Sequence, residues 1–401
     1  MPVRKSPAWP AAGTTGSSSK DRWLLFATRG FRAFGFGLSA VIVAVHLEGR
    51  GLTPQLIGVS IALGLAASSL LGVAFAALAA RVGQRIALSL CGCLMALAGV
   101  DLALAGPAWL LICAGLTGML GLASLDLGPF ASLEQAALAD VTPGRARNRA
   151  FARYSLTGAL AGAAGGLAAG IAGRDTNAAF LVYAALGLTT AALPMFLSAG
   201  AEPAEASRRV LGNLRPLAGL AGLFALDAFG GGMVANALIA YWLHVRFGAP
   251  TTVLGPLFAA IAVLQAGSYE LAGRLADRFG LVNTMVFTHL PSNLLLLLVP
   301  FSPTLPIAIL LLLARFCLSQ MDVPARQAYV VSIVPPADRA GAVASTGALR
   351  GVAQAFGPAL TGIAIQTAAV GLPFFIGGGV KAIYDVGLYV GFRRRPAEHE
   401  R

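Results

Sequence analysis

Several charged side chains lie inside long apolar stretches of this sequence, where they could bind a solute, pair with one another or carry a proton. Arg29 and Arg32 are three residues apart, which places them on one face of a helix. Asp227 lies in a second apolar stretch. A charge at the centre of a membrane-spanning helix costs roughly 2.5–3.5 kcal/mol on insertion scales, so each of these residues needs a function or a partner.

An internal repeat relates Arg32 to Asp227. The segment 32–37, Arg-Ala-Phe-Gly-Phe-Gly, aligns with the segment 227–232, Asp-Ala-Phe-Gly-Gly-Gly, at an offset of 195. If the first helix begins near Arg22, Arg32 lies about 15 Å deep, near the middle of a roughly 30 Å bilayer core. We predict that Arg32 and Asp227 form the central substrate-binding site, paired directly or through a solute. A purely structural ion pair is the alternative.

Three further arginines are candidate substrate-binding residues because they add positive charge inside apolar stretches: Arg29, Arg315 and Arg350. Arg29 could instead extend its head group to the lipid surface. Lys381 comes four residues before Asp385, so we expect these two side chains to neutralise each other in a structural pair.

Asp126 and Asp227 are the candidate proton carriers. Burial in an apolar environment favours the protonated form of a carboxyl group, which can then load and release a proton near neutral pH. A structural role is the alternative for Asp126. His289 is expected to be a hydrogen-bonded core residue rather than a ligand.

The composition identifies the surroundings of these residues as a lipid bilayer. Hydrophobic residues make up 57% of the chain and charged residues 11%, whereas a soluble domain has about 25% charged residues. The mean hydropathy is +0.76. Such a chain has too little charge to cover a water-exposed surface, and its 49 glycines suit closely packed membrane helices. The predicted fold class is an all-α membrane protein.

Twelve apolar runs are each long enough to span a bilayer, near residues 23–46, 56–79, 86–105, 108–132, 153–173, 178–198, 216–245, 252–272, 282–301, 304–324, 345–367 and 373–392. Twenty basic residues outside them fall on the side of the two termini and three on the other side, which predicts cytoplasmic termini. We expect a disordered cytoplasmic tail at 1–22, a six-helix bundle at 23–198, a cytoplasmic linker at 199–215, a second six-helix bundle at 216–392 and a cytoplasmic tail at 393–401.

A short basic turn between two apolar runs is expected to gate the molecule. It reads Gly273-Arg274-Leu275-Ala276-Asp277-Arg278-Phe279-Gly280, and a degraded copy in the first half keeps Arg81 and Gly83. The candidate gating residues come from these two turns and from a charged pair four residues apart: Gly273, Asp277, Arg278, Gly280, Arg81, Gly83, Asp322 and Arg326.

The spacing of other residues extends the repeat over both halves. Three glycine pairs are 197 residues apart: Gly51 and Gly248, Gly58 and Gly255, and Gly83 and Gly280. Two further pairs are 192 residues apart: Pro143 and Pro335, and Arg147 and Arg339. Parallel halves related by an axis along the membrane normal are one of the repeat arrangements that transporters use.

These residues resemble a bacterial-type transporter of the major facilitator superfamily. The second half satisfies the family's hairpin pattern G-x-x-x-D-R-x-G, whereas the first half has Ala76 and Ala80 in place of the glycine and the aspartate. The resemblance covers residues 23–392. It implies two pseudo-symmetric six-helix bundles around a cavity that opens alternately to each side, with Arg32 and Asp227 on cavity-lining helices.

The expected function is secondary active transport of a small organic solute, with proton-coupled efflux by an antiporter as the favoured form. The alternatives are a facilitator or importer of an organic anion, suggested by the excess of deep basic residues, and a non-transporting membrane sensor. No phosphate-binding loop, zinc-protease motif or nucleophile elbow is present, so neither enzyme activity nor a cofactor is expected.

The expected partners are the solute, protons and the lipid bilayer. The basic residues form no helix face suited to nucleic acid. The four cysteines lack metal-ligand spacing, so no metal site is expected. We expect a monomer in the inner membrane of the cell.

Overall fold

The computed structural model describes residues 15–104, 106–122, 128–142, 144–172, 175–198, 218–332 and 339–393, and its regular elements are all helices. The first half contains α1 (Thr15–Gly49), α2 (Pro54–Val82), α3 (Gln84–Ala103), α4 (Ala108–Leu116), α5 (Pro129–Asp140), α6 (Gly144–Ala172) and α7 (Thr176–Ala192). The second half contains α8 (Ala218–Met233), α9 (Asn236–Phe247), α10 (Thr251–Phe279), α11 (Leu281–Leu298), α12 (Leu305–Leu318), α13 (Asp322–Ser332), α14 (Arg339–Gln366) and α15 (Leu372–Phe392).

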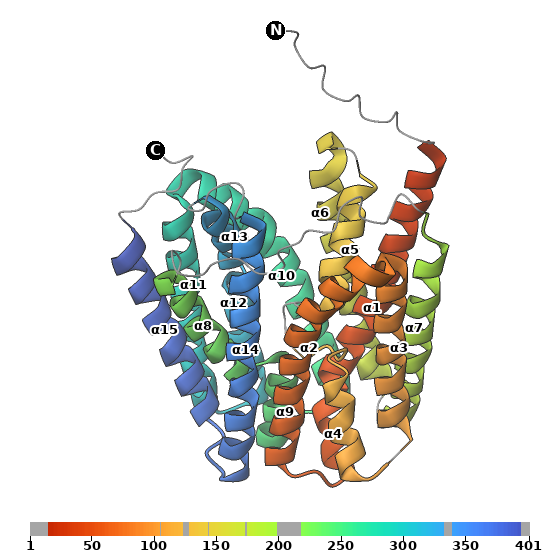
Figure 1. The fold of residues 1–401 in the computed structure, drawn as a ribbon. Coiled ribbons are helices and arrows are strands. Elements are labelled where there is room, and N and C mark those ends of the chain that lie inside the picture. Colours follow the sequence, from red (N-terminus) through yellow and green to blue (C-terminus); the bar gives the residue numbers. More distant parts are fainter. Residues whose placement is uncertain are drawn as a thin grey trace.

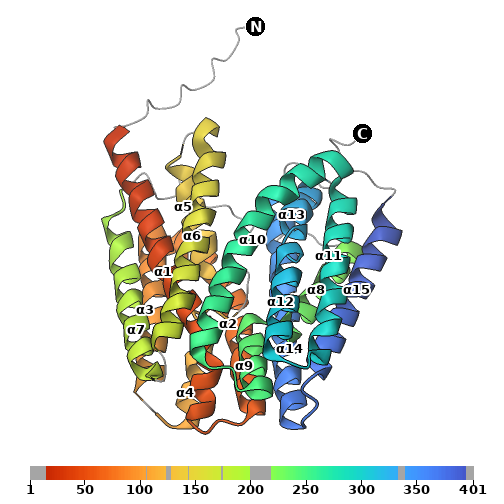
Figure 2. The same ribbon diagram turned by 180° about the vertical axis from the view of Figure 1, so that it is seen from behind.

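The helices form two groups that stand side by side, α1–α7 in one and α8–α15 in the other (Figures 1 and 2). α1 begins and α15 ends at the same end of the molecule, and the two groups diverge toward that end. By length and composition, nine helical segments within the described residues could cross a membrane. The predicted tails and linker lie largely outside the described residues, and the predicted domain boundaries stay a prediction.

Three of the predicted spans consist of two helices each, a division that the apolar runs did not indicate. The run predicted at 108–132 contains α4 and α5, the run at 216–245 contains α8 and α9, and the run at 304–324 contains α12 and the start of α13. Gly118, with φ +65°, ends the first helix of the first pair. In the third pair, α13 begins at Asp322, so Pro324 falls in its first turn, where proline is tolerated, and the helix continues to Ser332.

The glycines of the repeat occupy equivalent places in the two halves. Gly83 joins α2 to α3 with φ +88°, and Gly280 joins α10 to α11 with φ +84°. Each donates its N–H to the carbonyl four residues earlier, at 2.9 Å. This positive φ strains an L side chain, and glycine avoids the strain because it has no Cβ. The repeat read from the sequence is therefore present in the backbone.

Glycines also bring the two halves together at the end opposite to the start of α1. A Cβ at Gly58 of α2 would lie 2.4 Å from the carbonyl oxygen of Pro358 in α14. A Cβ at Gly255 of α10 would lie 2.5 Å from the carbonyl oxygen of Gly166 in α6. The absence of side chains thus lets α2 approach α14 and α10 approach α6 closely enough to close this end.

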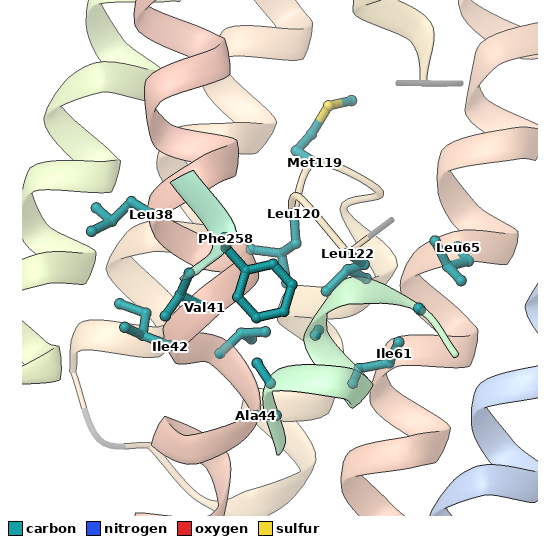
Figure 3. Close-up of a cluster of buried hydrophobic side chains, with 14 of the residues drawn as sticks. Leu38, Val41, Ile42, Ala44, Ile61, Leu65, Met119, Leu120, Leu122 and Phe258 are labelled. Carbon is teal, nitrogen blue, oxygen red and sulfur yellow. The ribbon is translucent and has the colours of Figure 1, made fainter. Parts of the chain in front are cut away.

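An apolar plug, formed by side chains of the first half around Phe258 of the second half, lies beside these contacts. In Figure 3 the ring of Phe258 from α10 lies among side chains of the first half, close to Val41 and Leu120. Its members are all less than a tenth exposed: Leu38, Val41, Ile42, Ala44, Ile61, Leu65, Met119, Leu120, Leu122 and Phe258. The plug excludes water from the closed end through buried apolar area.

Replacing Gly58 with alanine is expected to weaken closure at this end. The new methyl group would meet the backbone of Pro358 and Gly362, which cannot swing aside as a flexible side chain can. A cysteine placed at Ile61 in a chain without its native cysteines should then react faster with a maleimide. Gly379→Ala is the matched control, since a Cβ there has no atom within 4 Å. Equal reaction rates in the two variants would contradict this account of the closed end.

Candidate transport site

A cavity of about 880 Å³ lies between the two halves, and helices of both halves line it. Phe258, Leu65, Leu120 and Leu122 of the plug form part of its wall. Its polar lining is rich in carboxamides, from Gln135, Asn236, Gln265, Gln327 and Gln354. Among the described residues that line it, Arg29 alone carries a charge. The cavity therefore offers a solute many neutral hydrogen-bonding groups and one positive charge.

Arg29 reaches this cavity along the face of an aromatic ring. Its guanidinium carbon lies 4.8 Å from the ring centroid of Tyr154 in α6. Gly158, one turn further along α6, leaves room for the guanidinium, because a Cβ there would lie 2.2 Å from Nη2. The alternative considered for Arg29, snorkelling to the lipid surface, is therefore not its arrangement here.

Arg32 does not pair with Asp227, and the predicted direct pair between the two halves is wrong. Arg32 is fully buried, and its Nη2 donates to Oε2 of Glu134 in α5 at 2.7 Å. The hydroxyl of Tyr154 donates to the same oxygen at 2.5 Å. The rings of Phe36 and Phe130 lie 5.3 Å and 5.0 Å from the guanidinium carbon. Arg32 is thus neutralised inside the first half.

Asp227 is the centre of a separate cluster in the second half. Lys381 of α15 donates to Oδ1 of Asp227. Arg350 of α14 donates to Oδ2 at 2.9 Å, and Arg326 of α13 donates to Oδ2 at 3.4 Å. Arg326 also pairs with Asp322, so the charged pair predicted on this helix is confirmed. One carboxylate on α8 therefore holds three cations from three other helices.

The predicted pair between Lys381 and Asp385 is also wrong. Lys381 is directed to Asp227, whereas Asp385 is 2.8 Å from Nδ1 of His289 and accepts a hydrogen bond from Asn293 at 2.8 Å. Nε2 of His289 lies 3.6 Å from Asp227, so the imidazole stands between the two carboxylates. His289 is buried and hydrogen-bonded, as predicted.

The two halves contain the same interhelical ion pair with its charges exchanged. In the first half Arg32 of α1 meets Glu134 of α5, and in the second half Asp227 of α8 meets Arg326 of α13. Glu134 and Arg326 are 192 residues apart, the same offset as Pro143 and Pro335. Glu134 was not predicted as the partner of Arg32. The offset of 192 was the available signal, because it relates Glu134 to Arg326, which pairs with the repeat equivalent of Arg32.

The cluster around Asp227 borders a second, smaller cavity of about 70 Å³. Arg315 and Arg350, both predicted to bind substrate, line this cavity and not the larger one. Val323 and Gln354 line both cavities, so the two adjoin. The predicted cationic residues are therefore divided between the central cavity, which has Arg29, and a side cavity inside the second half.

The remaining predicted residues lie at the divergent end or outside the described part of the chain. Asp277 and Arg278 are exposed at the end of α10, where Arg278 lies over the ring of Phe279 at 5.3 Å. Arg81 is exposed at the end of α2. Their predicted role in gating, shared with Gly273, stays a prediction. Asp126, a candidate proton carrier, lies outside the described residues.

Comparison with known proteins agrees with this architecture. Residues 220–401 match the model of the Major Facilitator Superfamily. An uncharacterized membrane protein of Saccharomyces cerevisiae is 24% identical over 92% of this chain and 93% of its own.

Solved structures give the same result for the fold. A D-xylose–proton symporter superposes with a TM-score of 0.72 at 17% identity, over 92% of this chain and 97% of the symporter. A bacterial homolog of the human lysosomal transporter Spinster, in an inward-facing and occupied conformation, gives 0.73 at 16% identity, over 94% and 96%. The second half of this multi-pass membrane protein therefore matches the model of the Major Facilitator Superfamily, and the whole chain has the fold of these solved transporters.

Proposed function

We propose that the chain moves a small organic anion across the membrane by alternating access to the central cavity. The observation that carries this proposal is the charge of the lining. Arg29 is the one charged residue among the described residues of the cavity wall, and it is positive. In a low-dielectric site such an excess of positive charge attracts an anionic group.

The size and chemistry of the cavity fit a small molecule. Its volume of about 880 Å³ falls within the roughly 300–1,000 Å³ typical of small-molecule sites. The carboxamides can both donate and accept hydrogen bonds, so they suit hydroxyl and carbonyl groups of a polar solute. Phe36, Phe151 and Phe258 supply apolar surface for its carbon skeleton.

A molecule that is closed at one end and divergent at the other matches one of the two states that alternating access requires. The plug and the glycine contacts close the cavity at one end, while the two groups of helices diverge at the other. Because the buried ion pairs described above lie within one half or the other, each half can move as a unit without breaking them.

Replacing Arg29 with glutamine is expected to raise the anion concentration needed for half-maximal transport by about tenfold or more, since a charge-assisted hydrogen bond is lost. Counterflow into proteoliposomes should be measured with monocarboxylates, dicarboxylates and sugar phosphates beside matched uncharged analogues. Arg246→Gln, an exposed arginine at the end of α9, is the control and should transport as the wild type does. Exchange of the uncharged analogues alone would overturn the proposal.

The same proposal includes coupling to protons, export as the direction of transport, a monomeric state, and an inner-membrane location with cytoplasmic termini. With that orientation, the divergent end of the cavity faces the cytoplasm. Asp227, predicted from the sequence as a proton carrier, is held by three cations that favour its charged form, so it does not suit this role. An imposed pH gradient across the proteoliposomes should drive accumulation, and equal uptake with and without the gradient would contradict proton coupling.

A further inference from the structure

The side cavity of the second half contains hydrogen-bond donors for which the described residues provide no acceptor. Nε and Nη1 of Arg315 are buried and have no acceptor within the described residues, and the same holds for Oγ of Ser319. Arg315 is 5% exposed and Ser319 is 6% exposed. Both line the cavity of about 70 Å³. Buried donors of this kind are rare because leaving one unsatisfied is costly.

The cations around this cavity also outnumber the carboxylates. Arg315, Arg326, Arg350 and Lys381 face Asp227, Asp322 and, one residue behind the wall, Asp385. Four positive charges against three negative charges leave one positive charge in excess. Asp227 and Asp322 are already held by Arg326, Arg350 and Lys381, so the excess falls on Arg315.

The size of the cavity limits what can neutralise this charge. A water molecule occupies about 30 Å³ of liquid volume, so a cavity of about 70 Å³ holds roughly two particles of that size. An organic solute would not fit, whereas a halide ion would. Water could satisfy the donors, but it would leave the buried charge uncompensated, which is unfavourable in a low-dielectric interior.

We propose that this side cavity is a binding site for one small inorganic anion of the size of chloride, held by the guanidinium of Arg315 and the hydroxyl of Ser319. The guanidinium donates and cannot accept, which suits an anion that only accepts. The site is separate from the solute site, since Arg315 does not line the central cavity. Its occupancy does not depend on which solute the central cavity takes.

The test is equilibrium binding of radioactive chloride to the purified full-length chain, with gluconate replacing chloride at constant ionic strength. The wild type is expected to bind chloride saturably, close to one ion per chain, with displacement by bromide but not by gluconate. Arg315→Gln is expected to weaken binding by at least about tenfold, and Ser319→Ala by a smaller factor. Arg246→Gln is the matched control and should bind chloride as the wild type does.

Two results would overturn the proposal. One is the absence of saturable chloride binding to the wild type, a measurement that needs no variant to fold. The other is unchanged affinity in an Arg315→Gln protein that elutes as a single folded species. Failure of organic-anion counterflow would refute the proposed solute class and leave this binding result unaffected, so the two proposals can fail separately.

Discussion

Replacing Asp227 with alanine is expected to abolish transport and to reduce the yield of folded protein more than any other single change in the second half. The variant would leave Lys381, Arg350 and Arg326 without the carboxylate they share. Removing one partner of a buried ion pair costs about 3–5 kcal/mol, and here three cations lose an acceptor at once. Fluorescence-detected size-exclusion chromatography would measure folded yield, and counterflow would measure transport.

A double variant provides the control for this prediction. Asp227→Ala combined with Lys381→Ala removes the cation bonded to Oδ1 of Asp227 together with the carboxylate, so part of the folded yield should return. Transport should stay below the wild-type rate, because Arg350 still lacks the carboxylate that it binds in the wild type. Wild-type yield in the single variant would show that the cluster does not contribute to folding.

Exchanging the charges of Arg32 and Glu134 is expected to restore much of the stability that either single change removes. Arg32→Ala would leave Glu134 buried with Tyr154 as its one remaining donor among the contacts described above, at a cost of about 3–5 kcal/mol. In the double variant Arg32→Glu with Glu134→Arg the pair is re-formed between α1 and α5. The thermal unfolding midpoints of the two single variants and the double variant form a mutant cycle that measures this coupling.

A second exchange distinguishes this pairing from the one predicted by the repeat. Arg32→Asp combined with Asp227→Arg would restore stability only if these residues met between the halves. In the structure each has partners in its own half, so this exchange should be as damaging as the two single changes added together. Rescue by this exchange, and not by the first, would contradict the ion pairs described for the two halves.

Keeping these ion pairs inside each half has a consequence for the transport cycle. The described contacts between the halves at the closed end include apolar and glycine-backbone contacts, as at Gly58 and in the plug around Phe258, and a partly exposed ion pair between Glu48 of α1 and His244 of α9. Such contacts separate without leaving a buried charge unpaired. A buried ion pair between the halves, such as the one predicted from Arg32 and Asp227, would have to break in every cycle at a cost of several kcal/mol.

Much of the architecture was determined by the sequence. The lengths of the apolar runs determine how many segments can cross a bilayer, and the low fraction of charged residues excludes a largely water-exposed surface. The repeat was readable because positions such as Gly83 and Gly280 require a positive φ, which restricts them to glycine in both halves. The apolar lengths also placed the ends of several helices, among them α11 and α15, within a few residues.

The partners of the buried charges were decided by the tertiary structure alone. The apolar run around Arg32 shows that the arginine needs a counter-charge, but its partner Glu134 is 102 residues away and meets it only because α1 packs beside α5. Likewise, Lys381 and Asp385 share a helix face, yet Lys381 binds Asp227 because α8 presents a second carboxylate to it. Spacing along one helix specifies which residues can meet, whereas the packing of neighbouring helices determines which of those pairs is formed.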